Sequence, residues 1–306
     1  MLLASDWLEL QAVAIDANEV LEKGIRNSAG ETFYAVCVNA VGDWQWLSKS
    51  GYFSRSYANV NKRPLTEKSS PKGICHLCLA DQRSVPWENY RVYNFNVGVV
   101  PEWYHSMHTV TPWDEPSPLA SIGFIAGEEA GFWEYDLFHS YHLGVAKTLG
   151  ASCIALMSEA MASSNIDGRL EEVNNLFFAW ADEHREKTYL HGFTKANLGW
   201  PDTGTFPNGQ WSKGHVSTVV VNFFTHWAQQ QDLSTRDREL LKLSLDACCH
   251  ITSCLEGLYK GDVWLGKEEA IKIADHGMKF LNVYRILSYK SFRLKGIGSD
   301  PICAPG

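Results

Sequence analysis

The sequence has no long hydrophobic run and no excess of positive charge. No stretch of the 306 residues approaches the roughly 18 apolar residues that predict a membrane-spanning helix. Lysine and arginine number 27 against 35 acidic residues, for a formal net charge of −8. A nucleic-acid-binding surface usually shows a basic stripe, because phosphate neutralisation supplies much of the affinity. The sequence therefore argues against a membrane protein and against a free-standing DNA-binding domain.

Several catalytic and targeting signatures are also missing. There is no glycine-rich phosphate loop, no Gly-x-Ser-x-Gly and no His-Glu-x-x-His. The first residues reach Asp6 too early to form the apolar part of a secretory signal. Many of the eight cysteines fall inside apolar helical patterns, where a free cysteine behaves as a small hydrophobic residue. These features predict an intracellular, reducing location.

The chain divides by pattern into a mixed part, a helical part and a tail. Residues 1–119 are mixed and rich in loops, with prolines that exclude long helices between 74 and 119, and 120–295 are mainly helical. Residues 296–306 are expected to be disordered. The fold class is therefore α+β or mixed. Within the first part, the apolar runs 32–41 and 93–100 predict strands, the former buried.

The helical patterns are long and periodic. They predict helices over 6–24, 43–49, 137–163, 168–187, 215–231, 235–260 and 267–292. Ser234 and Asp237 are candidate caps at the start of one helix, and Gly261 is its expected stop. On this helix Cys248, Cys249, Cys254 and His250 could form a metal cluster. Core positions are the better interpretation, because no two of the thiols have Cys-x-x-Cys spacing and the surroundings are apolar.

Cys75 and Cys78 form the one Cys-x-x-Cys pair of the chain. Two thiolates at this spacing suit one edge of a tetrahedral zinc site, since a tight turn aims both sulfurs at one point. A structural site needs two more ligands. The candidates are the pairs His105 and His108 or His139 and His142, or His76 itself. The alternative is a turn with two buried thiols.

A second constellation begins at Asp136, three residues before His139 at the expected start of a long helix. Residues three apart on a helix share a face, so the carboxylate and the imidazole could converge. For a generic pair at this spacing the simpler interpretation is preferred: Asp136 caps the helix and His139 packs beneath it.

These motifs occur in an order that resembles the catalytic region of eukaryotic cut-and-paste transposases, most closely the CACTA-type and Plavaka-like groups. The resemblance covers about residues 31–160. It includes the Cys-x-x-Cys pair, the later Asp-x-x-His-x-x-x-Leu-Gly-Val-x-Lys at 136–147, and the segment 33–55 with Asn39, Asp43 and Arg55.

The resemblance implies an RNase H-like fold with three acidic residues that hold two divalent metals. Carboxylate oxygens suit Mg²⁺, and paired ions stabilise an in-line phosphoryl displacement. Asp136 would be a catalytic carboxylate, or its Asp-x-x-His motif would help a zinc site with Cys75, Cys78, His139 and His142. The first catalytic aspartate of the family normally precedes the strand at 32–41, and Asp43, which follows it, is the substitute here.

The sequence departs from the family pattern. No third acid stands near 211–218, where it would be expected. We therefore expect a transposase-derived fragment or decayed copy without an intact acidic triad. Its partner would be DNA and its location nuclear, with zinc as structural cofactor and Mg²⁺ only if activity survives. The alternative is a non-enzymatic, zinc-stapled module that binds protein or nucleic acid. A third reading is an unrelated helical enzyme.

Overall fold

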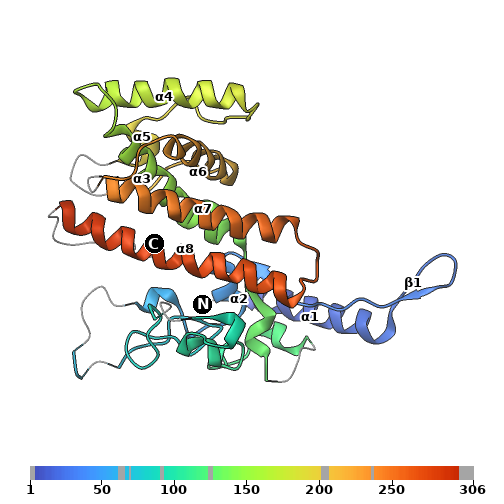
Figure 1. Ribbon diagram of the computed structural model, residues 1–306. Helices are drawn as coiled ribbons and strands as arrows, with labels where there is room; N and C mark the ends of the chain where they lie inside the picture. The colour runs from blue at the N-terminus through green and yellow to red at the C-terminus, as the bar shows by residue number, and fades with distance from the viewer. Residues whose placement is uncertain are drawn as a thin grey trace. The chain divides into compact units, whose positions relative to one another are not determined.

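The structure, a computed structural model, describes residues 4–60, 66–68, 70–89, 93–122, 127–200, 207–235 and 238–295. It confirms the coarse prediction of a mixed N-terminal part and a predominantly helical C-terminal part (Figure 1). Two compact units divide between Asp136 and Leu137, whereas the sequence pattern changes between 119 and 120. The tail predicted for 296–306 lies outside the described residues, as does Asp237.

The first unit opens with helix α1 (Ala4–Lys23), which ends at Gly24 in the left-handed conformation, as expected of a glycine after a helix. An antiparallel pair follows, β1 (Ile25–Arg26) with β2 (Thr32–Phe33). Strand β3 (Ala40–Gly42) then leads into helix α2 (Trp44–Ser50). Strand β4 (Trp133–Tyr135) pairs with β3 in parallel near the end of the unit.

Short 3-10 turns carry much of the chain between α2 and β4. They span Tyr57–Asn59, Phe95–Val97, Glu102–Ser106, Pro118–Ser121 and Glu129–Phe132. Among the described residues the sheets are two separate pairs of strands. The larger mixed sheet of an RNase H-like fold is therefore not present in this part of the chain.

Two strand predictions were wrong. Within 32–41 only the two ends are strands, and the intervening Tyr34, Val36 and Val38 are about two-thirds exposed. An apolar run is buried only where another element covers it, and β2 pairs with β1 over just two residues. Residues 93–100 form a tight loop instead of a strand, because Gly98 adopts φ 75° and an isolated bridge joins Asn94 to Val99.

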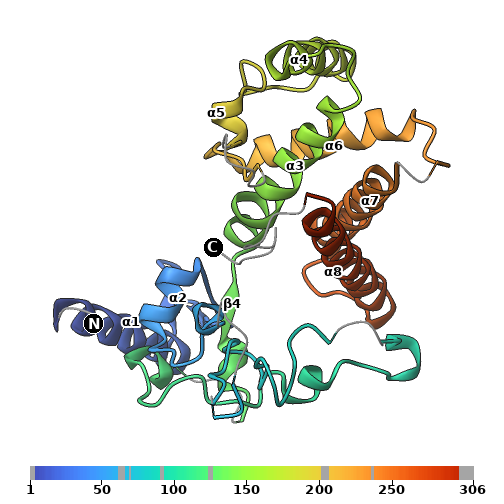
Figure 2. The same cartoon turned by 90° about the vertical axis from the view of Figure 1, so that its left-hand side faces the viewer.

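The second unit is built from helices (Figure 2). A π-helical turn (Phe138–Val145) runs into α3 (Ala146–Ser158), with non-helical backbone at Gly144. Then come α4 (Ile166–Glu183), the one-turn α5 (Lys195–Leu198) and α6 (Gly214–Gln229). Finally α7 (Glu239–Lys260) and α8 (Lys267–Lys295) lie side by side as a hairpin (Figure 1).

The second unit shares one large hydrophobic core. Its fully buried members include Phe177, Phe193, Phe223, Phe224 and Val220. The predicted helices agree with these elements within a few residues, and Gly261 ends α7 as expected. Ser234 is not its cap: α7 starts after Arg238 without a side-chain cap. No described helix is both long enough and apolar enough to cross a membrane.

Candidate functional site

The ends of strands β3 and β4 bring two predicted catalytic residues to one place. In this parallel pair Gly42 lies opposite Tyr135, and the Asp136 N–H donates to the Gly42 carbonyl at 3.2 Å. Asp43 and Asp136 are therefore the next residues in register at the carboxyl edge of the pair. Because adjacent strands lie about 4.8 Å apart, the two carboxylates start from neighbouring backbone positions.

Asp43 is also the N-cap of helix α2. Its backbone is extended, at φ −66° and ψ 163°, and its carboxylate accepts the Trp46 N–H at 2.8 Å. A carboxylate has about four acceptor positions, so this bond leaves others available to a cation. Asp43 and Asp136 are both half-buried. The edge can thus offer two oxygen ligands of the kind that Mg²⁺ prefers.

Glu134 is a further acidic residue close to this edge in sequence. It lies within strand β4, two residues before Asp136, which directly follows the strand. Burial raises the pKa of its carboxyl above the usual range, and the nearby His108 opposes this shift. Sequence reasoning missed Glu134, because nothing in its local pattern separates it from a solvated strand residue.

The Cys-x-x-Cys loop holds its two thiols together. Cys75 accepts a hydrogen bond from the Cys78 thiol, and this bond, together with the N–H groups of Leu77 and Cys78, lowers the pKa of Cys75 to about 7 despite burial. The same thiol–thiol bond and burial raise the pKa of Cys78, although the Ala80 N–H points to its sulfur. Backbone N–H groups aimed at both sulfurs favour the thiolate forms that bind zinc.

Arg55 fixes the shape of this loop. Its guanidinium donates to the carbonyls of Cys75 at 2.7 Å, Cys78 at 2.8 Å and Ala80 at 3.2 Å. Gly73 lies against the same guanidinium, and a Cβ there would collide with it. Arg55 thus binds three carbonyls of the loop with one side chain and fixes their relative positions. This structural role of Arg55 is visible only in the folded protein. In the sequence, Arg55 is connected with the loop only through the transposase resemblance.

His76, between the two cysteines, is fully buried in an aromatic cluster. Its ring stacks on Phe53 at a centroid distance of 4.6 Å and meets Trp44 and Tyr135. Nε2 donates to the Trp133 carbonyl at 2.8 Å, whereas Nδ1 has no hydrogen-bond partner among the described residues. Burial lowers the pKa of this imidazole to about 4. His76 therefore ties the Cys-x-x-Cys loop to strand β4 as a neutral ring.

His139 and His142 belong to the second unit, whereas the cysteines belong to the first. His139 is exposed and its ring lies edge-on to Phe138. His142 is buried, with Nε2 2.7 Å from the Tyr259 hydroxyl and Nδ1 3.2 Å from the Thr218 hydroxyl. A metal could bind His142 only after one of these hydrogen bonds breaks. That these histidines complete a zinc site stays a prediction.

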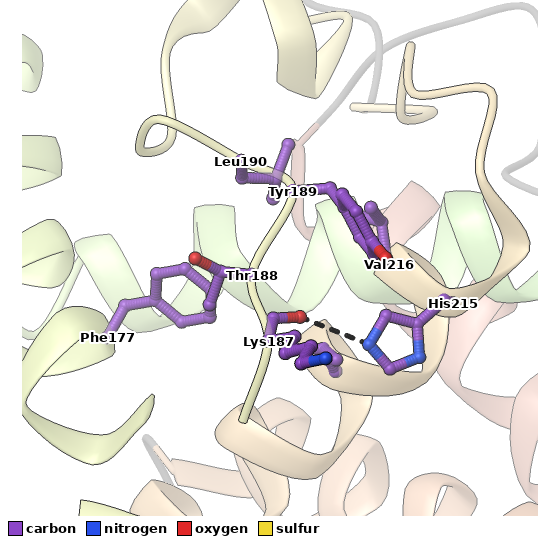
Figure 3. A pocket seen from close by; sticks show the side chains of 8 residues that line it. Phe177, Lys187, Thr188, Tyr189, Leu190, His215 and Val216 are labelled. Carbon is purple, nitrogen blue, oxygen red and sulfur yellow. Dashed lines mark hydrogen bonds between the residues drawn. The ribbon is translucent and has the colours of Figure 1, made fainter. Parts of the chain in front are cut away.

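No three histidine, cysteine, aspartate or glutamate side chains converge on one metal position in the part of the chain that the structure describes. One surface depression lies between residues 187–190 and the start of α6, where the His215 Nε2 lies 3.1 Å from the Lys187 carbonyl (Figure 3). It encloses essentially no space that a water molecule could occupy. We assign it no ligand.

Comparison of the chain with protein families, with curated proteins and with solved structures finds no match. Two constellations of the first unit, the strand-end carboxylates and the Cys-x-x-Cys loop, are therefore the features that point to a function.

Proposed function

We propose that the chain is a transposase-derived protein whose strand pair β3–β4 is a remnant of an RNase H-like catalytic sheet. One observation carries the proposal: Asp43 and Asp136 follow directly on adjacent parallel strands that pair in register. Two carboxylates at one strand edge can together bind a divalent cation of the kind that assists phosphoryl transfer.

The proposed chemistry is partial. A two-metal mechanism needs enough carboxylates to hold both ions, because each ion stabilises either the attacking or the leaving oxygen. Two strand-end aspartates suffice for one hydrated Mg²⁺, an ion that keeps several waters and takes one or two carboxylates. We therefore propose that the protein binds one Mg²⁺ or Mn²⁺ but has lost strand transfer, with DNA as its partner and the nucleus as its location.

Manganese binding tests this proposal. We expect Asp136→Asn and Asp43→Asn each to weaken Mn²⁺ binding, measured by electron paramagnetic resonance of the free ion, while Asp43→Asn keeps a cap of equal quality. Asp114→Asn, at an exposed aspartate of the same unit, is the matched control. Equal Mn²⁺ binding by the wild type and Asp136→Asn would overturn the proposal. DNA cleavage that depends on Asp136 would show that more catalysis survives than we propose.

The second candidate function is a non-enzymatic module, stapled by zinc, that binds protein or nucleic acid. The Cys75–Cys78 loop favours it, because backbone N–H groups point at both sulfurs and Arg55 holds the turn. Metal analysis of the purified protein should find zinc, and Cys75→Ser should lower the melting temperature of the zinc-bound protein. Cys37→Ser, at an exposed cysteine, should change neither. Absence of zinc, or an unchanged melting temperature in Cys75→Ser, would exclude this candidate.

A further inference from the structure

The hairpin of α7 and α8 places two histidines face to face. His250 on α7 and His276 on α8 have their Nδ1 atoms 3.4 Å apart, with ring centroids 5.6 Å apart and planes inclined by 49°. Both residues are half-buried, so solvent can reach the rings although they lie against the neighbouring helix. The helices on both sides hold them by packing, for example of Gly257 against Ile273.

The separation of the two nitrogens matches a shared metal ion. Two imidazole nitrogens bound to tetrahedral zinc at 2.0–2.1 Å are separated by about 3.4 Å. At 3.4 Å the two nitrogens form a long hydrogen bond, outside the usual range of about 2.7–3.2 Å. A metal ion could take the place of the shared proton without a change in the separation of the rings.

The charges around the pair also suit a cation. Asp246 lies one turn before His250 on α7, and Asp275 precedes His276 on α8, where it pairs with Lys279 at 2.7 Å. The charged side chains that act on His250 are thus two carboxylates, Asp246 and Asp275, and one ammonium, Lys279. Their net charge is negative, which favours a cation.

A second histidine pair in the same unit shows what a non-chelating arrangement looks like. His184 and His226 also contact each other, at a centroid distance of 4.9 Å and nearly perpendicular. The His184 Nδ1 lies 2.8 Å from the Trp180 carbonyl, and the His226 Nε2 lies 2.8 Å from the Gln230 amide nitrogen. These nitrogens point at separate partners on their own helices, whereas those of His250 and His276 point at each other.

We propose that His250 and His276 form a two-imidazole clamp for a divalent transition-metal ion of the zinc type, which joins α7 to α8. Imidazole nitrogen is a common ligand for Zn²⁺, Cu²⁺ and Ni²⁺. Because no third acidic, thiol or imidazole side chain converges with the pair among the described residues, water fills the other positions. This site is independent of the Cys75–Cys78 loop, which lies in the other unit.

Calorimetric titration of the full chain with Zn²⁺ tests the clamp. The double variant Cys75→Ser/Cys78→Ser serves as the background, so that loss or absence of the thiol site leaves the result readable. In this background we expect one zinc ion to bind per chain. His250→Gln and His276→Gln should each raise the dissociation constant at least ~10-fold, because loss of even a residue that only supports a metal ligand costs about that much. His226→Gln should bind as the background does.

A thermal melt provides the second measurement. Zinc that binds only the folded state raises the melting temperature, so it should do so in the background and in His226→Gln but much less in His250→Gln. If the glutamine variant fails to fold, a zinc-dependent shift of the His250 and His276 ring resonances in the background protein decides the question instead. The same affinity in His250→Gln and the background, or ring resonances that zinc leaves unmoved, would overturn the clamp.

Discussion

Each of the two units of this chain has its own kind of hydrophobic core. The second unit buries one continuous core of aliphatic and aromatic side chains shared by its helices. The first unit has two smaller clusters, one around Trp133 and Leu47 and one around Ile74 and Cys78. His76 links them, because its ring stacks on Phe53 and hydrogen-bonds to the Trp133 carbonyl. The second unit thus has one large core, whereas in the first unit polar contacts supplement two small ones. Most of the candidate site residues lie in the first, loop-rich unit.

The largest effect should come from the core of the second unit. Phe177 is fully buried and contacts Phe193, Phe223 and Trp180. We expect Phe177→Ala to lower the free energy of unfolding of this unit by about 3–5 kcal/mol, through lost burial and the cavity left behind. The adjacent Phe178 is 41% exposed, so Phe178→Ala should cost much less. Urea denaturation followed by circular dichroism measures both, and equal losses would contradict a packed core at Phe177.

The first unit should respond most strongly to pH through His76. Its pKa is lowered to about 4 by burial, against about 6.5 in an unfolded chain, so the unfolded state binds the proton more readily between these values. As the pH falls from 6.5 to 4, the first unit should lose up to roughly 3 kcal/mol of stability. His76→Phe should flatten this dependence in urea denaturation curves. A slope that survives in His76→Phe would assign the effect to another group.

A smaller loss is expected from the clamp on the Cys-x-x-Cys loop. Arg55→Met removes a charged guanidinium whose N–H groups donate to three carbonyls. Hydrogen bonds to charged groups contribute about 1.5–3 kcal/mol each. Water can reach part of the loop, so we expect a net cost of about 2 kcal/mol. Arg26→Met, at an exposed arginine, is the control. Thermal denaturation without zinc compares them, and equal stability of the two variants would remove Arg55 from the account.

The smallest effect concerns thiol reactivity. With its pKa lowered to about 7, Cys75 should be alkylated readily at pH 8, and its rate should fall about tenfold per pH unit below 7 as the thiolate is protonated. Cys153 in the second unit is fully buried and burial raises its pKa, so it should stay unmodified until the unit unfolds. Peptide mapping after timed iodoacetamide treatment distinguishes them. Faster labelling of Cys153 than of Cys75 would reverse the comparison.

The sequence predicts the second unit better than the first for a physical reason. Helical periodicity is local, so patterns such as those of α6 and α7 identify both the helix and its buried face. Whether residues 32–41 are buried depends instead on distant partners. The structure leaves Tyr34 and Val36 exposed. The pairing of Asp43 with Asp136 depends on register between remote strands, which no local pattern encodes. The Cys75–Cys78 turn was recognisable from spacing, but its Arg55 clamp was not.

The central claim is that Asp43 and Asp136 are neighbours at one strand edge, and engineered cross-linking tests it most directly. Residues in register on adjacent strands lie about 5 Å apart, within disulfide range, whereas a two-residue offset gives about 8 Å and prevents bridging. Mild oxidation of Asp43→Cys/Asp136→Cys should therefore yield a peptide linking positions 43 and 136, identified by mass spectrometry. Val41→Cys/Asp136→Cys, with Val41 paired to Glu134, should not cross-link. Absence of the 43–136 link, or equal yields in both variants, would contradict the account.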